Sequence, residues 1–462
     1  MTMTAPVATT TPFLERIADE LGAAGVRYCQ WKGHFKQARW MLGDGDIDLL
    51  VAPEWLTQML DVLQAAGFRQ TTAPEDYRLL GTAHYRAPEP GTDRMIHVHV
   101  HTRLLVEAAR GTVYRLPVEE ALLASSGPGT LFPTPAAELE ALVFVLRTTL
   151  RWASWRRVPG GTREELRYLE GLTDSREILD SLGRHLPAVE PEVFLRCRRA
   201  LDKGATLRQR WSARRGLTRA LASFSRSPSV AERVAHAAAA AAWHLRGGPR
   251  RYSLARVTTG GIVLALSGTD GSGKSTCARA LAAWLRPHVL LMRAHVGRPP
   301  RSLLTLVVGA LRRLMPLPQL EWLRQLCTAR DRYRLVVRAW RFALDGGIAL
   351  TERYPLGPDH ALVGPRIREL AGPNPSALAR RLAALEEAYY RRLPTPDLIF
   401  VLDVEPDVAV RRKTDEPADY VRARAEAMQK ADWSGTSARI IDASRPLEDV
   451  IDDLRMSVWE AL

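Results

Sequence analysis

The last part of the chain alternates short apolar runs with amphipathic stretches of helical length. Short apolar runs bounded by turn residues are typical of strands that are buried on both faces. Strands separated by helices predict a parallel sheet covered by helices on both faces, which is a doubly wound α/β fold. The five predicted strands are 262–266, 289–295, 348–351, 398–404 and 440–442.

The earlier part of the chain has two other patterns. Residues 13–21 have the periodicity of a helix, and strand-like runs follow at 47–51 and 96–100. This mixture predicts a small α+β domain. The stretch after it is helical in pattern almost throughout, including 138–150 and the alanine-rich 230–245.

Glycine and proline at 247–249 interrupt the helical pattern before the last block begins. A chain of 462 residues is long enough for two or three domains that each bury a core. We therefore expect an α+β domain at 1–125, a helical connecting region at 126–255 and the five-stranded domain at 256–462.

Hydropathy and cysteine content indicate a protein of the cytoplasm. No apolar run reaches the roughly 20 residues that a membrane-spanning helix needs, so the run 303–311 is expected to be a core helix. Residues 1–12 lack the basic segment and apolar core of a secretory signal. The four cysteines are far apart in the sequence and are expected to be reduced.

The net charge of +14 comes almost entirely from arginine. Such a charge attracts nucleic acid, an anionic membrane surface or phosphorylated small molecules. The densest arginine clusters lie at 208–219, 246–256 and 330–341, in helix-like segments where a solvated face accounts for them. Nucleic acid is therefore not the favoured partner, and no membrane partner is expected. The oligomeric state stays open, with a dimer as one alternative.

A glycine-rich segment between the first predicted strand and helix of the last block carries the clearest chemical signal. It matches the spacing G-x-x-x-x-G-K-[ST] of a loop that binds nucleotide phosphates. Backbone N–H groups surround the phosphates in such a loop, the lysine binds the β- and γ-phosphates, and the hydroxyl binds Mg²⁺. The residues expected to bind the cofactors ATP and Mg²⁺ are Gly268, Gly271, Ser272, Gly273, Lys274, Ser275 and Thr276, with Ser275 as the metal ligand.

An acid at position 270 inside this loop narrows the class of protein. The block resembles the thymidylate kinase family, whose loop has the pattern G-x-D-G-x-G-K-[ST] and matches 268–275 at every fixed position. Later motifs occur in the family's order. They are Glu352-Arg353-Tyr354 after a strand, Leu402-Asp403-Val404-Glu405-Pro406 before a helix, Arg411-Arg412-Lys413 before a short lid, and Ile441-Asp442-Ala443-Ser444-Arg445-Pro446 at the last strand.

The resemblance implies roles in phosphoryl transfer for several residues of these motifs. Catalysis of that reaction consists mainly of positioning and of cationic stabilisation of the transferred group. Lys274 and the lid arginines Arg411 and Arg412 would stabilise that charge. The remaining implied roles are Arg353 holding the acceptor, Glu352 near the metal or the acceptor, Asp270 facing the acceptor, and Ala443 and Arg445 bordering the adenine.

Two departures from the family pattern bear on the acceptor. Glu352 replaces the usual aspartate, and its extra methylene would shift a metal-bound carboxylate by about 1 Å or change its angle. The residues that shape the acceptor pocket in the family have no recognisable counterpart here. Cations that could bind an anionic acceptor are Arg293, His295, Arg298, Arg330 and Arg334.

A second signal lies in the N-terminal domain. Asp46 and Asp48 are two residues apart on a predicted strand, so both carboxylates project from one face and could share a divalent metal. With the glycines nearby, this resembles the DNA polymerase β-type nucleotidyltransferases, which carry a third acid on a later strand. That strand here contains His97, His99 and His101, with His99 in the position of the third acid and a candidate metal ligand. Alternate histidines could also bind a transition metal, or they could be structural.

Three functions fit these signals. The first is ATP- and Mg²⁺-dependent phosphoryl transfer to a nucleotide or another small-molecule acceptor. It would stand beside a nucleotidyltransferase-like domain that lacks the third acid, for which both nucleotide transfer and binding without transfer stay open. The second is a nucleic-acid end-processing kinase and nucleotidyltransferase, which would use aromatic residues among the arginines. The third is a nucleotide-dependent switch whose N-terminal domain binds a partner.

Overall fold

The structure is a computed structural model that describes residues 11–41, 45–72, 81–108, 112–151, 160–227, 229, 231–232, 234, 255–355 and 364–462. The chain packs into two compact units. One comprises Met1–Glu89 with Arg94–Arg250, and the other comprises Pro90–Asp93 with Arg251–Leu462. Each unit is described by itself.

The first unit is built on a mixed sheet with the strand order β1-β2-β5-β4-β3. Strands β2 and β5 are parallel, and the other neighbours are antiparallel. The predicted helix 13–21 and the predicted strands 47–51 and 96–100 lie within α1, β2 and β5. The elements are α1 (Pro12–Ala23), β1 (Tyr28–Lys32), α2 (Gln37–Trp40), β2 (Asp46–Val51), α3 (Leu56–Ala65), β3 (Arg69–Thr72), β4 (Thr82–Pro88) and β5 (Met95–His101).

One face of this sheet is apolar and the other is polar at its centre. Successive side chains of a strand point to opposite faces. Ile47 and Leu49 of β2 and Val98 of β5 are buried in a core with α1 and α3. Asp48 and His99 alternate with them and are paired across β2 and β5, so they share the opposite face.

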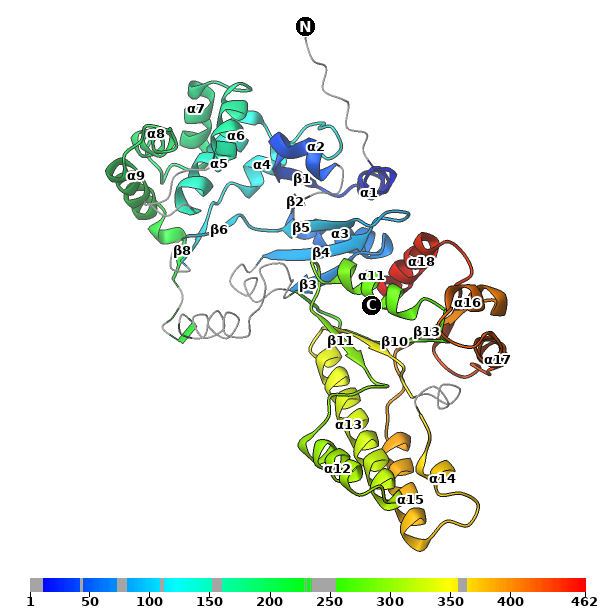
Figure 1. Ribbon diagram of the computed structural model, residues 1–462. Helices are drawn as coiled ribbons and strands as arrows, with labels where there is room; N and C mark the ends of the chain where they lie inside the picture. The colour runs from blue at the N-terminus through cyan, green and yellow to red at the C-terminus, as the bar shows by residue number, and fades with distance from the viewer. Residues whose placement is uncertain are drawn as a thin grey trace. The chain divides into compact units, whose positions relative to one another are not determined.

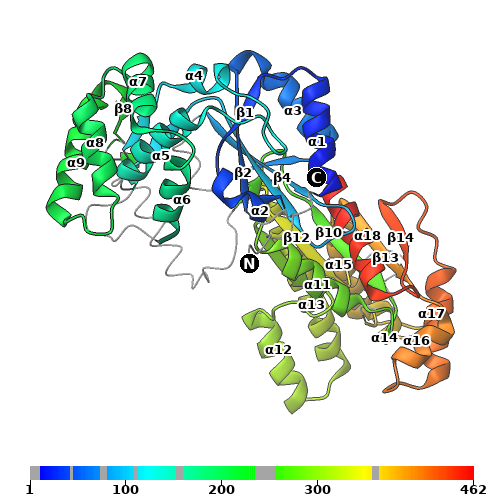
Figure 2. The ribbon, with the colours of Figure 1, turned by 90° about the horizontal axis from the view of Figure 1, so that it is seen from above.

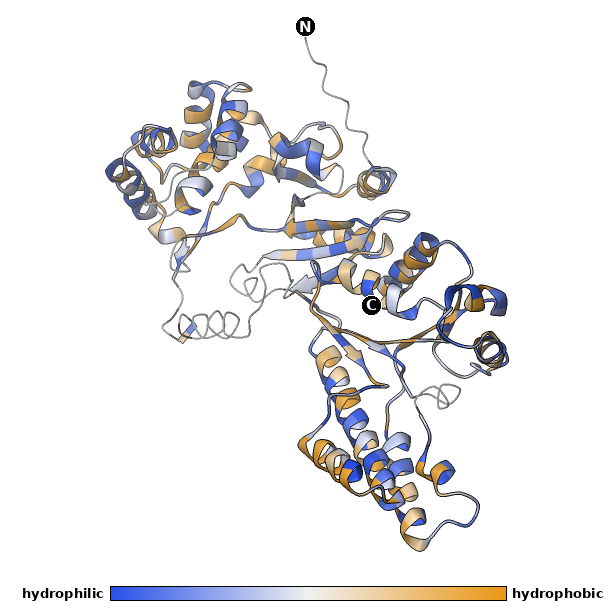
Figure 3. Ribbon diagram, in the orientation of Figure 1, coloured by the Kyte–Doolittle hydropathy of each residue, from blue (hydrophilic) through white to orange (hydrophobic). Residues whose placement is uncertain are grey.

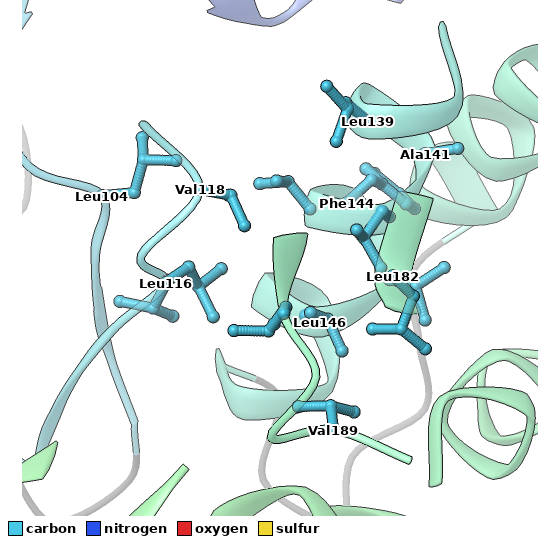
Figure 4. Close-up of a cluster of buried hydrophobic side chains, with 14 of the residues drawn as sticks. Leu104, Leu116, Val118, Leu139, Ala141, Phe144, Leu146, Leu182 and Val189 are labelled. Carbon is cyan, nitrogen blue, oxygen red and sulfur yellow. The ribbon is translucent and has the colours of Figure 1, made fainter. Parts of the chain in front are cut away.

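The helical segment packs as part of the first unit. Its helices share a core with β1, to which Cys29 and Trp31 contribute. Figure 4 shows Leu116 and Val118 gathered with Leu146 and Leu182 in this core. The predicted helix 138–150 lies within α5, whereas 230–245 lies almost wholly outside the described residues. The elements are β6 (Leu105–Glu107), β7 (Val113–Arg115), α4 (Glu119–Ala124), α5 (Ala137–Arg151), α6 (Gly160–Glu170), α7 (Ser175–His185), α8 (Pro191–Ala200), α9 (Leu207–Ala220) and β8 (Ser225–Arg226).

The second unit contains a parallel sheet of five strands in the order β11-β12-β10-β13-β14. All five strands predicted from the apolar runs are confirmed, with ends that differ by a few residues. The elements are β9 (Arg256–Val257), β10 (Val263–Gly268), α11 (Lys274–Leu285), β11 (Leu291–His295), α12 (Leu303–Leu314), α13 (Pro318–Leu344), β12 (Ile348–Glu352), α14 (Ile367–Leu370), α15 (Ala377–Arg391), β13 (Leu398–Asp403), α16 (Pro406–Arg412), α17 (Ala418–Gln429), β14 (Ala438–Asp442) and α18 (Leu447–Glu460).

Helices cover both faces of the parallel sheet, as the sequence pattern predicts. Helices α11 and α18 pack against each other on one face, and α13 lies on the other with α15 beside it (Figures 1 and 2). Val263 and Ala265 of β10 pack against Leu335 and Ala339 of α13. Their neighbours on the strand point the other way and are also buried, which explains the unbroken apolar run.

Helix α12 corrects one expectation. The apolar run 303–311 was expected to be a core helix, but α12 is partly hydrophobic on its exposed side (Figure 3). Leu303 is 82 % exposed and Leu314 is 79 % exposed, while Thr305 and Val308 face α13 and are buried. Hydropathy alone could not reveal that α12 is covered on only one side. Across the described residues, no helix is both long and apolar enough to cross a membrane.

Replacing Leu142, which is fully buried in α5, tests whether the helices and the first sheet share one core. We expect Leu142→Ala to reduce the free energy of unfolding by about 2–5 kcal/mol, because the buried isopropyl group is lost and a cavity is left. The rate of amide hydrogen exchange, measured by mass spectrometry, should rise in peptides from both β1 and α7. The exposed Leu207→Ala of α9 is the control, with an effect below about 0.5 kcal/mol. A rise in exchange confined to the helices would contradict the shared core.

Candidate active site

The predicted phosphate loop joins the end of β10 to the start of α11, in the strand-loop-helix context that the motif requires. Three of its glycines have positive φ angles, which are 146° at Gly268, 85° at Gly271 and 84° at Gly273. L-residues with a side chain rarely adopt such angles, so the glycines are needed for the backbone to follow this path.

The loop is also in close contact with β13, which neighbours β10 in the sheet, and with α16. A Cβ atom on Gly268 would lie 2.9 Å from the carbonyl oxygen of Leu402 at the end of β13. A Cβ on Gly271 would lie 2.7 Å from the carbonyl oxygen of Ala409 in α16. The absence of these side chains therefore lets the loop, β13 and α16 pack together.

Lys274 is buried and folds back over the loop. Its Nζ donates to the carbonyl oxygens of Gly268 and Thr269, and Ser272 Oγ donates to the same Thr269 oxygen at 2.8 Å. This position holds the ammonium group beside the backbone N–H groups at the start of α11. Together with the helix dipole, they form an environment that attracts an anion.

Ser275, just after the loop, and Glu352, at the end of β12, lie next to each other. Ser275 Oγ is 3.5 Å from Glu352 Oε2, and Glu352 is 5 % exposed. The other oxygen, Oε1, accepts from Arg293 Nε at 3.0 Å and Nη2 at 2.6 Å. Hydroxyl and carboxylate oxygens are ligands that suit Mg²⁺, so these residues fit that ion. Arg293, one of the cations that the sequence offers for an anionic acceptor, contacts this carboxylate.

Asp270 is bound by two arginines from different parts of the chain. Its Oδ1 accepts from Arg353 Nη2 at 3.1 Å, and its Oδ2 accepts from Arg424 Nη1 at 3.0 Å. Arg353 follows β12, whereas Arg424 lies on α17. The structure thus brings Asp270 and Arg353 together as side chains of one site.

Arg353 has an unusual backbone conformation. Among the described residues, it alone has a positive φ outside glycine, with a value of 54°. This conformation costs an L-residue roughly 1–2 kcal/mol. Such strain is concentrated at functional sites, where the surrounding structure holds the residue in place.

Arg424 was missed in the sequence. It belongs to no motif and lies on α17, whose pattern is that of an ordinary surface helix. The acid at Asp270 was the one available signal, because a carboxylate inside a phosphate loop needs cations nearby. Nothing in the spacing indicated which of the many arginines would supply them.

A pocket with a volume of about 210 Å³ lies beside the loop. Arg412 Nη1 donates to the Ala443 carbonyl oxygen at 2.7 Å and so ties the end of α16 to the loop after β14. Arg411, next to it, is exposed. Burial raises the pKa of the Cys277 thiol, which suits a packing role. The pocket is lined by Ser272, Gly273, Thr276, Cys277, Arg412, Ala443, Arg445, Leu447 and Val450.

The predicted acids of the first unit lie on the polar face of its sheet. Burial opposes ionisation of Asp46, but the hydrogen bond from His97 and the charges of His99 and His97 together outweigh it and lower the pKa to about 2. Asp48 Oδ1 is 2.9 Å from Lys32 Nζ, and despite burial its pKa is also lowered. Burial lowers the pKa of His97 and of His101 to about 4.

His99 lies opposite Asp48 in the register of β2 and β5. Its Nδ1 is 3.1 Å from Asp48 Oδ1. A further histidine, His84 of β4, is paired with His99 and was missed because only β5 showed alternate histidines. The resemblance to nucleotidyltransferases rests on these residues alone and stays a prediction.

No protein-family model matches the chain. Two curated proteins resemble part of it. The thymidylate kinase of Symbiobacterium thermophilum is 27 % identical over 219 residues, covering 44 % of this chain and 94 % of that protein. The thymidylate kinase of Nitratidesulfovibrio vulgaris is 28 % identical over 226 residues, covering 44 % of this chain and 93 % of that protein. The chain therefore contains a thymidylate kinase-like region.

The packing of the loop predicts different effects for two neighbouring glycines. Gly271→Ala and Gly273→Ala introduce similar backbone strain, but only the Gly271 Cβ would meet another atom within 4 Å. We expect Gly271→Ala to destabilise the second unit by about 1–3 kcal/mol more, because α16 must move away. Denaturant unfolding and hydrogen exchange of α16 measure the effect, with Gly273→Ala as the matched control. Equal destabilisation by the two variants would contradict the close contact.

Proposed function

We propose that the second unit transfers the γ-phosphoryl group of ATP, in the presence of Mg²⁺, to a phosphorylated small molecule. A nucleoside monophosphate is the first candidate acceptor. The observation that carries the proposal is the binding of Asp270, a residue of the phosphate loop, to both Arg353 and Arg424. Two cations are thereby held beside the place where the donor phosphates would bind.

The donor side follows from the loop. Lys274 and the N–H groups at the start of α11 would bind the β- and γ-phosphates, and Ser275 with Glu352 would hold Mg²⁺. The ion would neutralise charge on the phosphate oxygens. The pocket beside the loop, bordered by Ala443 and Arg412, would hold the adenine.

The acceptor side follows from the charges around the loop. Arg293, Arg353 and Arg424 contribute three positive charges, and Asp270 with Glu352 contributes two negative charges, so the cluster has a net charge of +1. A phosphate group on the acceptor would complement it. The strained backbone of Arg353 aims its guanidinium at Asp270, which favours a positioning role for the pair. The two thymidylate kinases that resemble this region support a nucleotide as the acceptor.

The first experiment is an acceptor screen. Full-length protein with ATP and Mg²⁺ is offered nucleoside monophosphates, nucleosides, sugar phosphates and a 5′-hydroxyl oligonucleotide, and the products are identified by mass spectrometry. We expect phosphorylation of at least one phosphorylated small molecule and a rate lower by about 100-fold or more in Lys274→Ala. Circular dichroism confirms that the variant is folded.

The screen also separates the alternatives. Phosphorylation of the oligonucleotide alone would favour end processing of nucleic acid. Hydrolysis of ATP without transfer to any acceptor would favour a switch. Either result would overturn the proposal, as would complete inactivity of the wild-type protein.

A second experiment tests Arg424. We expect Arg424→Ala to lower kcat/KM for the acceptor by about 10- to 100-fold and to change the KM for ATP by less than about threefold. The reason is that Arg424 donates to the Asp270 side chain and is not among the residues that line the pocket beside the loop. Arg422→Ala is the matched control, since Arg422 lies on the same helix and pairs with Asp407 instead. Equal losses in the two variants would contradict a specific role for Arg424.

A further inference from the structure

Three histidines converge on the polar face of the first unit's sheet. His97 Nε2 is 3.1 Å from His99 Nε2, and His84 Nδ1 is 3.3 Å from His97 Nε2. The three nitrogens all lie within 4.8 Å of one another. They come from two strands that are hydrogen-bonded neighbours, so the sheet itself sets their spacing.

Hydrogen bonds to the two aspartates decide which nitrogens carry protons. His97 Nδ1 is 2.7 Å from Asp46 Oδ1, and His99 Nδ1 is 3.1 Å from Asp48 Oδ1. A carboxylate can only accept a hydrogen bond, so each Nδ1 carries the proton. In a neutral ring, each Nε2 then has a lone pair, and two lone pairs that face each other repel. A cation between the nitrogens removes this repulsion.

We propose that His84, His97 and His99 bind a divalent transition metal of the zinc type. Metal–nitrogen bonds of about 2.0–2.1 Å in a tetrahedral site place the nitrogens about 3.3 Å apart. The two closest separations in the cluster are near that value. Imidazole nitrogen is a ligand that suits zinc, copper and nickel rather than Mg²⁺ or Ca²⁺. This site is independent of the phosphoryl transfer proposed for the second unit.

Asp46 and Asp48 act in this site from outside the metal's ligand shell. Histidines that bind metals usually donate their second N–H to a carboxylate, which fixes the ring and raises its basicity. Asp46 does this for His97 and Asp48 does it for His99. The sequence predicted both acids as direct ligands together with His99. The structure keeps His99 as a ligand in the proposal and gives the acids an orienting role.

The charges around the cluster also favour a metal ion that prefers nitrogen ligands to carboxylate oxygens. Lys32 pairs with Asp48, and the positive charge of Arg86 acts on His97. Arg147 also acts on Asp48, so at least three cations surround the two carboxylates and no excess of acid attracts a hard ion. Three protein ligands leave a fourth position for water, as in catalytic zinc sites. His97 and His99 are partly exposed, which allows a metal to reach them.

A second group of candidate ligands overlaps the first and is less suitable. It consists of Asp48, His99 and His101. Here Asp48 Oδ1 already lies 2.9 Å from Lys32 Nζ and 3.1 Å from both His99 Nδ1 and His101 Nε2. These contacts satisfy the oxygen without a metal. His101 therefore serves as a matched control on the same strand and the same face.

The experiment measures zinc binding by the full-length protein after treatment with a chelator. Equilibrium dialysis against Zn²⁺ with elemental analysis gives stoichiometry and affinity, and the visible absorption of the Co²⁺-substituted protein reports its coordination. We expect one zinc per chain with four-coordinate Co²⁺ spectra. His84→Ala and His97→Ala should weaken binding by more than about 100-fold, His101→Ala by less than about threefold, and Asp46→Ala by about 10- to 100-fold.

Circular dichroism shows whether each variant is folded, and Lys274→Ala should bind zinc like the wild type. Loss of zinc in His101→Ala with retention in His84→Ala would overturn the proposal in favour of the second group. Absence of zinc binding in the wild-type protein would overturn it in favour of hydrogen-bonded histidines. Binding of Mg²⁺ that depends on Asp46 but not on His84 would overturn it in favour of a carboxylate site.

Discussion

The contact of the Asp270 carboxylate with Arg353 and Arg424 is the interaction on which the candidate active site depends. Asp270 lies in a loop that also has to leave room for phosphates. An unpaired acid there would repel them, so the site needs cations from elsewhere in the fold. One comes from the strained turn after β12 and the other from α17. The carboxylate thereby connects three segments that are remote in sequence.

Backbone packing supports the same site. The loop approaches β13 and α16 so closely that side chains at Gly268 and Gly271 would not fit. Arg412 joins α16 to the segment after β14. Movement of α16 would therefore change both the loop and the pocket beside it. The loop meets β13 and α16 through backbone atoms, which side-chain rotation cannot relax, and α16 meets the border of the pocket through the Arg412 side chain.

The first unit uses paired acids in a different chemical setting. Asp46 and Asp48 contact imidazoles and Lys32 rather than guanidinium groups. A guanidinium has no lone pair to offer a metal, whereas an imidazole whose Nδ1 is bound to a carboxylate has one on Nε2. Similar carboxylates thus contact guanidinium groups in a candidate anion-binding site of one unit and converging imidazole nitrogens in the other.

The sequence by itself determined the five strands of the second unit and the glycine-rich loop, because apolar strand runs and glycine φ angles are local properties of the chain. Apolar runs predicted all five parallel strands, and three glycines with Lys274 predicted the loop. Only the tertiary structure decided that Arg424 meets Asp270, that His84 meets His97, that α12 is exposed, and that the helical segment shares a core with β1. Those contacts join residues far apart in the chain or on neighbouring strands, and local patterns carry no information about which distant partner a side chain will meet.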